Sequence, residues 1–369
     1  MPRVDQIDFE QVPDSPGVYV LWPLQGAPHI GKTTRLRRRL SRLLRLLGPA
    51  AERVDYYPTG SAFESMLAVY RLARRHRPED YRVFLRLRIP PFLKLDLANP
   101  YPRCHLTRRL GSDSALYFGP FTTRAAAERF QSAFLDLFLI RRCREEIRPD
   151  PAHPGCIYGE MSMCLRPCQG ASTPEQYHAE AGRVAAFLTT AGRSLVRQLG
   201  EDRQQASAEL EFERAARLHR RLEKTLEALK LNEELARDLD RFYGVVIQRS
   251  VDPQSVELWF FKQGFLQPGR RLGLAVQEGR PESLDQKLRQ TIENLGIRRQ
   301  PARRRAEQLG LLLRWHASSW RQGEWLMFDD PDQVPYRKLV RAVSRVGQDP
   351  AREFLIGRRI PFRGISSSP

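Results

Sequence analysis

The feature that most constrains what this 369-residue chain can fold into is a group of four closely spaced cysteines. These predicted metal ligands are Cys143, Cys156, Cys164 and Cys168. Four thiolates can complete a tetrahedral zinc site or ligate an iron–sulfur cluster. The spacing shows neither the short pair of a zinc ribbon nor a ferredoxin run, so it predicts a metal centre and leaves the metal open. The fifth cysteine, Cys104, stands apart and is predicted to fill buried space.

Charge decides the class of partner. Lysine and arginine total 61 against 43 acidic residues, which gives a formal net charge of +18. Such a surplus, mostly arginine, attracts polyanions through phosphate contacts. Nucleic acid is therefore the expected partner, with an anionic membrane surface a distant second. No apolar run approaches the length of a membrane span and no basic-then-apolar leader opens the chain, so we expect a soluble cytoplasmic protein with reduced thiols.

The first hundred residues are predicted to form a small α/β unit. Strand-forming residues at 17–22 predict one strand, and a second follows the turn that contains Gly26 and Pro28. Residues 33–47 predict an amphipathic helix with leucines on one stripe and arginines on another. The arginines that we predict to bind phosphates are Arg35, Arg38, Arg42 and Arg45. A second helix over 62–77 is ended by Pro78, and alternating residues predict strands at 83–89 and 92–97.

The rest of the chain alternates irregular, helical and mixed stretches. A connector over 101–170 carries one predicted helix, at 123–139, and residues 173–232 predict two helices. The first of these two begins with the capping box of Thr173 and Gln176. Beyond residue 242, strands at 242–248 and 256–262 predict a hairpin, followed by helices near 281–295 and 302–320. The serine-rich tail after Arg363 is expected to be mobile. The predicted fold class is α+β.

Short motifs near the start of the first unit and around the cysteines resemble known families. The segment 16–19, Pro-Gly-Val-Tyr, stands ahead of 29–32, His-Ile-Gly-Lys, and the pair is similar to the signature of GIY-YIG nucleases. The cysteines and their Pro and Arg neighbours resemble UvrC, the incision subunit of the bacterial excinuclease of nucleotide excision repair, and its shorter relative Cho. The resemblance covers roughly residues 13–235. It implies that the polyanion is DNA and that the cysteines hold a [4Fe–4S] cluster, with zinc as the alternative.

The same resemblance assigns catalytic roles at the amino-terminal end. Tyr19 matches the tyrosine that acts as general base, and His29 replaces the second tyrosine, where it could accept a proton or bind a phosphate. Lys32 and Arg39 match cations that neutralise charge on the phosphate. An active site of this type would also need Mg²⁺ or Mn²⁺, held by a carboxylate.

The carboxylate is where the sequence departs from the family. The position of the metal-binding glutamate falls on Val69, and a valine offers no oxygen ligand to magnesium. The nearest acid on that helix is Glu64, whose side chain points about 140° away from the needed direction. The family's asparagine also falls near Tyr81 or Arg82. Two hypotheses follow: an active Cho-like incision endonuclease, or a non-catalytic DNA-binding adaptor or regulator of the repair machinery. A third, an RNA-binding metalloprotein, rests on charge alone.

A later segment, 208–217, resembles the UVR motif, the helical hairpin through which UvrC docks on UvrB. The residues predicted to contact such a partner are Leu210, Phe212, Ala215 and Ala216. A plain helical pair that packs on its own chain is the alternative. The predicted organisation is a nuclease-like domain at 13–100, a connector with the cysteines at 101–170, a UVR-like hairpin at 173–235 and an α+β region at 240–365. No function is predicted for 263–369, although its arginines at 298–299 and 303–305 suggest phosphate contacts.

Overall fold

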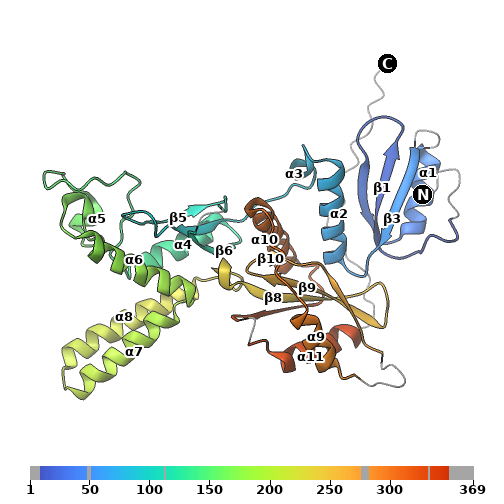
Figure 1. Cartoon of the computed structure of the whole chain (residues 1–369). Helices are drawn as coiled ribbons and strands as arrows, with labels where there is room; N and C mark the ends of the chain where they lie inside the picture. Colours follow the sequence, from blue (N-terminus) through green and yellow to red (C-terminus); the bar gives the residue numbers. More distant parts are fainter. Residues whose placement is uncertain (1–8, 48–50, 112–113, 276–281, 331–332, 349–369) are drawn as a thin grey trace.

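The computed structural model describes residues 9–47, 51–111, 114–275, 282–330 and 333–348. The described residues form three small antiparallel sheets with helices packed on them, which confirms a mixed α+β chain. A helical hairpin projects at the end of the molecule opposite the amino-terminal sheet (Figure 1). No described helix is both long and apolar enough to cross a bilayer. The predicted mobile tail lies outside the described residues.

The amino-terminal unit is a three-stranded sheet between helices. Its strands are β1 (Gly17–Pro23), β2 (His29–Thr33) and β3 (Ala51–Pro58), in the order β2-β1-β3. Its helices are α1 (Leu36–Leu47), α2 (Ala62–His76) and the short α3 (Tyr81–Phe84). The strand predicted at 17–22, the strand after the turn with Gly26 and Pro28, and both long helices are confirmed, but β3 was not predicted. Tyr19 and Leu21 pack with α1 on one face of the sheet, whereas Val18, Val20 and Ile30 join the cluster of α2 on the other.

The strand predicted at 83–89 is wrong. Residues 81–84 form α3, and the chain then runs to residue 91 without pairing in a sheet. The alternation that suggested a strand is nevertheless real in space. Leu85, Leu87 and Ile89 pack against the core cluster, while Arg86 and Arg88 are exposed. An extended segment anchored along one side therefore gives the same pattern as a half-buried strand.

The middle of the chain holds a second sheet, in the order β5-β4-β6-β7. Its strands are β4 (Phe92–Leu95), β5 (Cys104–Thr107), β6 (Leu116–Gly119) and β7 (Arg237–Asp238). Two helices contact it, α4 (Arg124–Leu135) and α6 (Pro174–Thr189), and the short helix α5 (Ile157–Glu160) lies between them in the chain. The capping box at Thr173 and Gln176 is confirmed. The expected connector thus contains two unpredicted strands, and Cys104 on β5 is buried as predicted.

Residues 173–232 form three helices instead of the two predicted. After α6, the helices α7 (Arg193–Ala208) and α8 (Phe212–Lys230) pair as the projecting hairpin. The extra break falls at Gly192, which has a φ of +83°, and a Cβ there would meet Leu229 at 2.4 Å. Glycine therefore permits both the left-handed turn and the close approach of α8. Leu210, predicted within the second helix, lies in the turn between α7 and α8.

The carboxy-terminal part forms the third sheet, in which β10-β9-β8-β12 are neighbours and β11 also pairs with β9. The strands are β8 (Tyr243–Arg249), β9 (Ser255–Lys262), β10 (Phe265–Leu266), β11 (Arg270–Gly273) and β12 (Glu324–Phe328). The helices are α9 (Leu284–Glu293), α10 (Ala302–His316) and α11 (Tyr336–Gln348). The predicted hairpin and two helices are confirmed. Strand β12 and helix α11 were not predicted.

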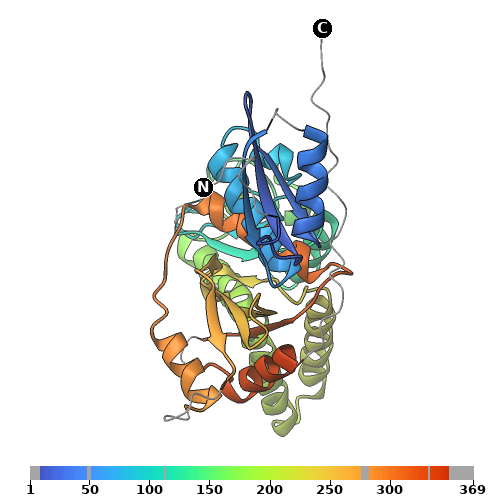
Figure 2. The same ribbon diagram turned by 90° about the vertical axis from the view of Figure 1, so that its right-hand side faces the viewer.

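One hydrophobic cluster joins the first and last parts of the chain. It combines residues of β1, β2 and α2 with residues of β8, β9 and α10. Phe63 of α2 lies edge-on to Trp315, with ring centroids 5.2 Å apart, and to Trp259 at 6.3 Å. The turned view shows the amino-terminal sheet next to the third sheet and its helices (Figure 2). Helix α2 therefore lies between two parts of the protein, and most of its surface is buried.

Candidate functional sites

Three of the four predicted catalytic residues gather on the α1 face of the first sheet. In the β1–β2 register Tyr19 is opposite Gly31 and Leu21 is opposite His29, so Tyr19 and His29 point to the same side. Their ring centroids are 6.0 Å apart. Arg39 comes from α1, and its Nε donates to the Tyr19 hydroxyl over 3.3 Å. A phenol, an imidazole and a guanidinium thus share one small site.

Gly31 fixes the position of the Tyr19 ring. A Cβ built at Gly31 would lie 2.4 Å from the Tyr19 hydroxyl oxygen and from Cζ. Any other residue would push the phenol away from Arg39. The glycine of the second motif therefore has a local reason: it lets the tyrosine of the first motif lie flat across the neighbouring strand.

Burial and two arginines keep His29 neutral. The pKa of His29 is lowered by burial first, and then by the positive charges of Arg39 and Arg77. A neutral imidazole can accept a proton, which is the role expected of a base beside a phosphate. The side chains that act on it are cationic, so the site is electropositive and suited to a phosphate group.

Lys32, the fourth predicted catalytic residue, lies on the other face of the sheet. It is opposite Val18 in the register, and its Nζ lies 5.8 Å from the Trp320 ring centroid. Burial and the charge of Arg314 lower the pKa of Lys32 to about 8. The structure therefore separates Lys32 from the Tyr19, His29 and Arg39 group.

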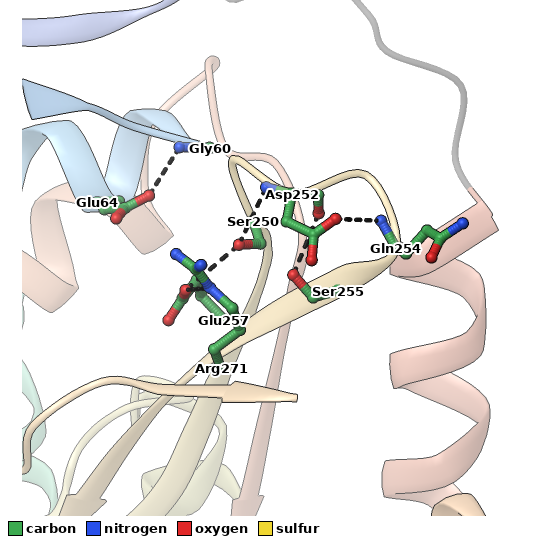
Figure 3. A network of polar contacts seen from close by, with 8 residues as sticks. All are labelled: Gly60, Glu64, Ser250, Asp252, Gln254, Ser255, Glu257 and Arg271. Atoms are coloured by element: carbon green, nitrogen blue, oxygen red, sulfur yellow. Dashed lines mark hydrogen bonds and ion pairs between the residues drawn. The ribbon is translucent and has the colours of Figure 1, made fainter. Parts of the chain in front are cut away.

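Neither of the two positions considered for the metal-binding carboxylate, Val69 and Glu64, reaches the Tyr19 face of the first sheet. Val69 is 4% exposed and belongs to the cluster of α2, not to that of Tyr19. The charges of Glu257 and Arg271 in the third sheet act on Glu64, and its Oε2 accepts from the amide of Gly60, in the loop before α2, over 2.7 Å (Figure 3). Burial raises the pKa of Glu64, and the charge of nearby Glu257 adds to the rise. Within the described residues, no three His, Cys, Asp or Glu side chains are arranged to hold a metal ion.

The four α1 arginines predicted to bind phosphates face solvent. Their side chains are exposed, and none of them forms an ion pair with a described acid. The first turn of α1 carries no acid. Helix α1 lies at the outer side of the first sheet (Figure 1), so this arginine face is open to a large ligand.

The four predicted metal ligands come together around one small cavity. Loops that follow α4 and flank α5 bring them there, and the cavity lining also includes Arg141, Gly159 and Arg166. All four are free thiols in the structure. Cys164 and Cys168 are buried, whereas Cys143 and Cys156 are half-buried. All four cysteines line one cavity, and four thiolates are a donor set that suits zinc or an iron–sulfur cluster, although no three described side chains are placed here to hold a metal ion.

Burial and the neighbouring cysteines disfavour the thiolate form of Cys164 and Cys168. Burial raises the pKa of Cys164 to about 11, and interaction with the other three cysteines raises it further. Burial, Cys156 and Cys143 likewise raise the pKa of Cys168. Only a nearby cation makes several thiolates stable in so small a volume. The Nη1 atom of buried Arg141 lies 3.9 Å from Cys143 Sγ and donates to the Glu145 carbonyl, which also holds the loop in place.

The predicted docking residues lie at the tip of the α7–α8 hairpin. Leu210 is 70% exposed with a φ of +57°, and Phe212 is 69% exposed at the start of α8. Ala215 is half-buried and Ala216 exposed on the same helix. The hairpin's own packing uses other residues, among them Leu195, Leu199 and Ala206. Two large apolar side chains therefore remain exposed at the tip.

Sequence reasoning missed one buried polar centre, at Glu307. Its carboxylate accepts from the hydroxyls of Tyr70 and Tyr81, each over 2.7 Å, and from Arg82 over 2.6 Å. The run of arginines at 303–305 drew attention away from it. Arg303 approaches Glu307 to 3.5 Å, and Arg305 pairs with Asp240, so two of these arginines also have structural contacts. A lone acid among the apolar residues of α10 was the available signal.

Two family models match the central part of the chain. Residues 90–187 match the UvrC/Cho excinuclease middle domain, and residues 193–225 match the UvrB/UvrC motif. UvrABC system protein C of Desulforudis audaxviator is 34% identical over 220 residues, which is 57% of this chain and 35% of that protein. The same protein of Methanothermobacter thermautotrophicus is 30% identical over 267 residues, 70% of this chain and 45% of that protein. No solved structure was found to match.

These matches identify a chain that contains the middle domain of the UvrC/Cho excinucleases, with the cysteines inside it, and a UVR motif at the α7–α8 hairpin. It is a distant homologue of UvrABC system protein C, and the resemblance to UvrC is confirmed. The matched region spans less than half of these relatives. Neither family profile extends over residues 13–89, so the nuclease-like roles stay predictions.

Proposed function

We propose that this UvrC-related chain acts in nucleotide excision repair as a DNA-binding protein whose amino-terminal module holds DNA better than it cuts it. The observation that carries the proposal is the make-up of the Tyr19 site. Tyr19, His29 and Arg39 supply a hydroxyl, a neutral imidazole and a cation, and the exposed arginines of α1 lie on the adjoining helix. No described group of acids completes a metal site there.

The chemistry of phosphodiester hydrolysis explains why the missing acid matters. A single divalent metal held by a carboxylate would neutralise the leaving oxygen, which arginine alone does less well. A module with phosphate contacts and no such ligand still binds a strand. We therefore propose an adaptor or regulator of the excision-repair machinery, with weak or no incision by this module.

A nicking assay on plasmid DNA that carries a lesion tests this function. The unmodified chain should bind the DNA and leave it uncut with Mg²⁺ or Mn²⁺, in the presence or absence of a UvrB homologue. Robust metal-dependent nicking by the unmodified chain would overturn the proposal of weak or no incision. Failure to bind DNA at all would overturn the wider proposal that this chain is a DNA-binding protein.

Metal content gives a separate expectation for the cysteine centre. We propose that Cys143, Cys156, Cys164 and Cys168 hold an iron–sulfur cluster, as the UvrC relatives suggest, with zinc as the alternative. Cys164→Ser should abolish stoichiometric metal, because one ligand of four is lost from a buried position. Elemental analysis and the visible spectrum of anaerobically purified protein check this. Cys104→Ser, which alters a buried cysteine on β5 outside the cavity, should retain the metal.

The hairpin tip is proposed to dock on a UvrB-like partner. Phe212→Ala should weaken that complex by about 2 kcal/mol, roughly 30-fold in Kd, because an exposed aromatic side chain is a typical interface anchor. The melting temperature should change little, since Phe212 is 69% exposed. Titration calorimetry with a UvrB homologue measures the effect. Leu226→Ala, on the same helix but away from the tip, should leave affinity unchanged.

A further inference from the structure

A groove rich in arginine runs along the segment that links α3 to β4. Two cavities, of about 640 and 860 Å³, share Leu87, Arg88, Ile89 and Arg108 in their walls. We call the two together the arginine groove. Its first cavity also has Arg86, Arg124 and Arg314 in its lining, and its second has Arg82, Arg109 and Arg303. No aspartate or glutamate is among the described residues that line either cavity.

Most of these arginines have no acid to neutralise them. Arg86, Arg88, Arg108, Arg109 and Arg314 are exposed, and none forms an ion pair with a described carboxylate. Arg82 and Arg303 share Glu307, and Arg124 pairs with Glu128. Guanidinium groups collected in a concave site raise the local potential far above that of a flat surface. The groove therefore suits a chain of anions.

The backbone at Arg86 has a conformation that is strained for arginine. Arg86 has a φ of +48°, the left-handed region that glycine occupies with least strain. It ends α3, with the Leu87 amide donating to the Arg82 carbonyl over 2.9 Å and the Arg86 amide to Val83 over 3.0 Å. Glycine is the usual residue at this position of a helix end. A side chain that projects into the groove explains the choice of arginine.

The wall of the groove is rigid. A Cβ at Gly310 of α10 would meet the Arg88 carbonyl at 2.7 Å, so the segment lies directly on that helix. Leu85, Leu87 and Ile89 anchor it in the core cluster. Arg88 therefore projects from a fixed backbone, and less conformational entropy is lost when it binds a ligand.

We propose that the arginine groove binds an unpaired DNA strand, with phosphates on the arginines and bases against its apolar wall. Cavities of this size accept a few nucleotides rather than a paired helix. Phe84, Pro91 and Leu313 supply apolar surface beside the cations, the combination that single-strand sites use. That the strand is DNA rests on the proposed function. The site is distinct from the arginines of α1, which face solvent on the first sheet.

Fluorescence anisotropy with a labelled oligo(dT), measured at several salt concentrations, tests the proposal. The oligonucleotide has about 20 nucleotides, which exceeds the roughly 4–16 nucleotides of known single-strand sites. The double variant Arg88→Ala, Arg108→Ala should lower affinity about tenfold. In a plot of log affinity against log salt concentration, the slope of this variant should be less steep by about 1.4, because two phosphate contacts are lost. Affinity for a blunt duplex should fall less. The matched control is Arg197→Ala, Arg220→Ala, which removes two exposed arginines of the hairpin that form no ion pair with a described acid.

Arg86→Gly separates a ligand role from a structural one. Glycine relieves the left-handed backbone, so the melting temperature should stay the same or rise while oligo(dT) affinity falls. Unchanged affinity and slope in the groove variants, or an equal loss in the hairpin control, would overturn the groove. If the unmodified chain binds neither oligo(dT) nor duplex, the proposed function fails as well. If Arg38→Ala, Arg42→Ala on α1 weakens DNA binding and the groove pair does not, only the groove proposal is lost.

Discussion

Replacing Val69 with glutamate is expected to destabilise the protein by roughly 5 kcal/mol and to produce no nicking activity. Val69 is 4% exposed and lies in the hydrophobic cluster that α2 shares with the third sheet and α10. A carboxylate there would either remain charged in an apolar interior or take up a proton, with its pKa raised by several units. Either outcome costs folding free energy, and neither puts an oxygen beside Tyr19.

The chain offers a matched control for this substitution. Val83 on α3 is 81% exposed, so Val83→Glu makes the same chemical change in water and should shift stability by less than about 0.5 kcal/mol. Denaturant midpoints for the two variants give the comparison directly. Nicking assays with Mg²⁺ or Mn²⁺ accompany them. A stable Val69→Glu variant that cuts DNA would show that residue 69 reaches the Tyr19 face, contrary to the structure.

Local patterns in the sequence predicted the elements that are stabilised locally. The amphipathic pattern of α1, the capping box of α6 and the alternation of β8 and β9 each involve neighbouring residues. Strand β3 was not predicted because it pairs with β1, from which β2 and α1 separate it in the sequence. No turn links the two strands, so no turn residues mark the pair. Strand β12 pairs with β8, far away in the sequence. Such strands depend on long-range contacts that periodicity does not record.

The candidate sites divide in the same way. The short signatures located Tyr19, His29 and Arg39, and the structure brings these three together because Gly31 opens space for the Tyr19 ring. The spacing of cysteines along the chain marked one centre, and the four do line one cavity. Counting along α2 to Val69 could identify a residue but not its surroundings. Val69 belongs to a cluster that also includes residues of β9 and α10, which a count along one helix cannot predict.

The segment 83–89 shows how a correct pattern supports a wrong structure. Alternation reports only that one side of an extended chain is buried. Here the buried side packs on the core and Gly310 of α10, so no neighbouring strand is needed. The exposed side holds Arg86 and Arg88, which then line a groove. The same pattern that fails as a strand prediction therefore marks the residues of the further site.

The second large effect is expected at Glu307, where Glu307→Ala should destabilise the protein by about 3–5 kcal/mol. Its side chain is 1% exposed and accepts hydrogen bonds from Tyr70, Tyr81 and Arg82. Alanine would leave two buried hydroxyls and a partly buried guanidinium without their acceptor. Because Tyr70 and Tyr81 belong to α2 and α3 and Glu307 to α10, the loss falls on the junction between the first and last parts of the chain.

Hydrogen exchange shows where in the protein the stability is lost, and the lowered pKa of Glu307 determines how stability depends on pH. Amides of α2 and α10 should lose protection in Glu307→Ala, while those of α7 and α8 keep it. Burial acts to raise the pKa of Glu307, but the hydrogen bonds from Tyr70, Tyr81 and Arg82 outweigh it and the pKa is lowered. A lowered carboxyl pKa stabilises the fold above the unfolded value, near 4.3, and this stability is lost as pH falls through the folded pKa.

Glu307→Gln should therefore lose less stability than the unmodified chain between about pH 5 and pH 3, because a glutamine does not titrate. The control is Glu201→Gln, at an exposed glutamate of α7 with no described ion pair. It should follow the unmodified chain at every pH. An equal acid dependence in Glu307→Gln would mean that the buried carboxylate contributes nothing to the junction. Urea denaturation across this pH range distinguishes the two outcomes, since each midpoint reports the folding free energy at its own pH.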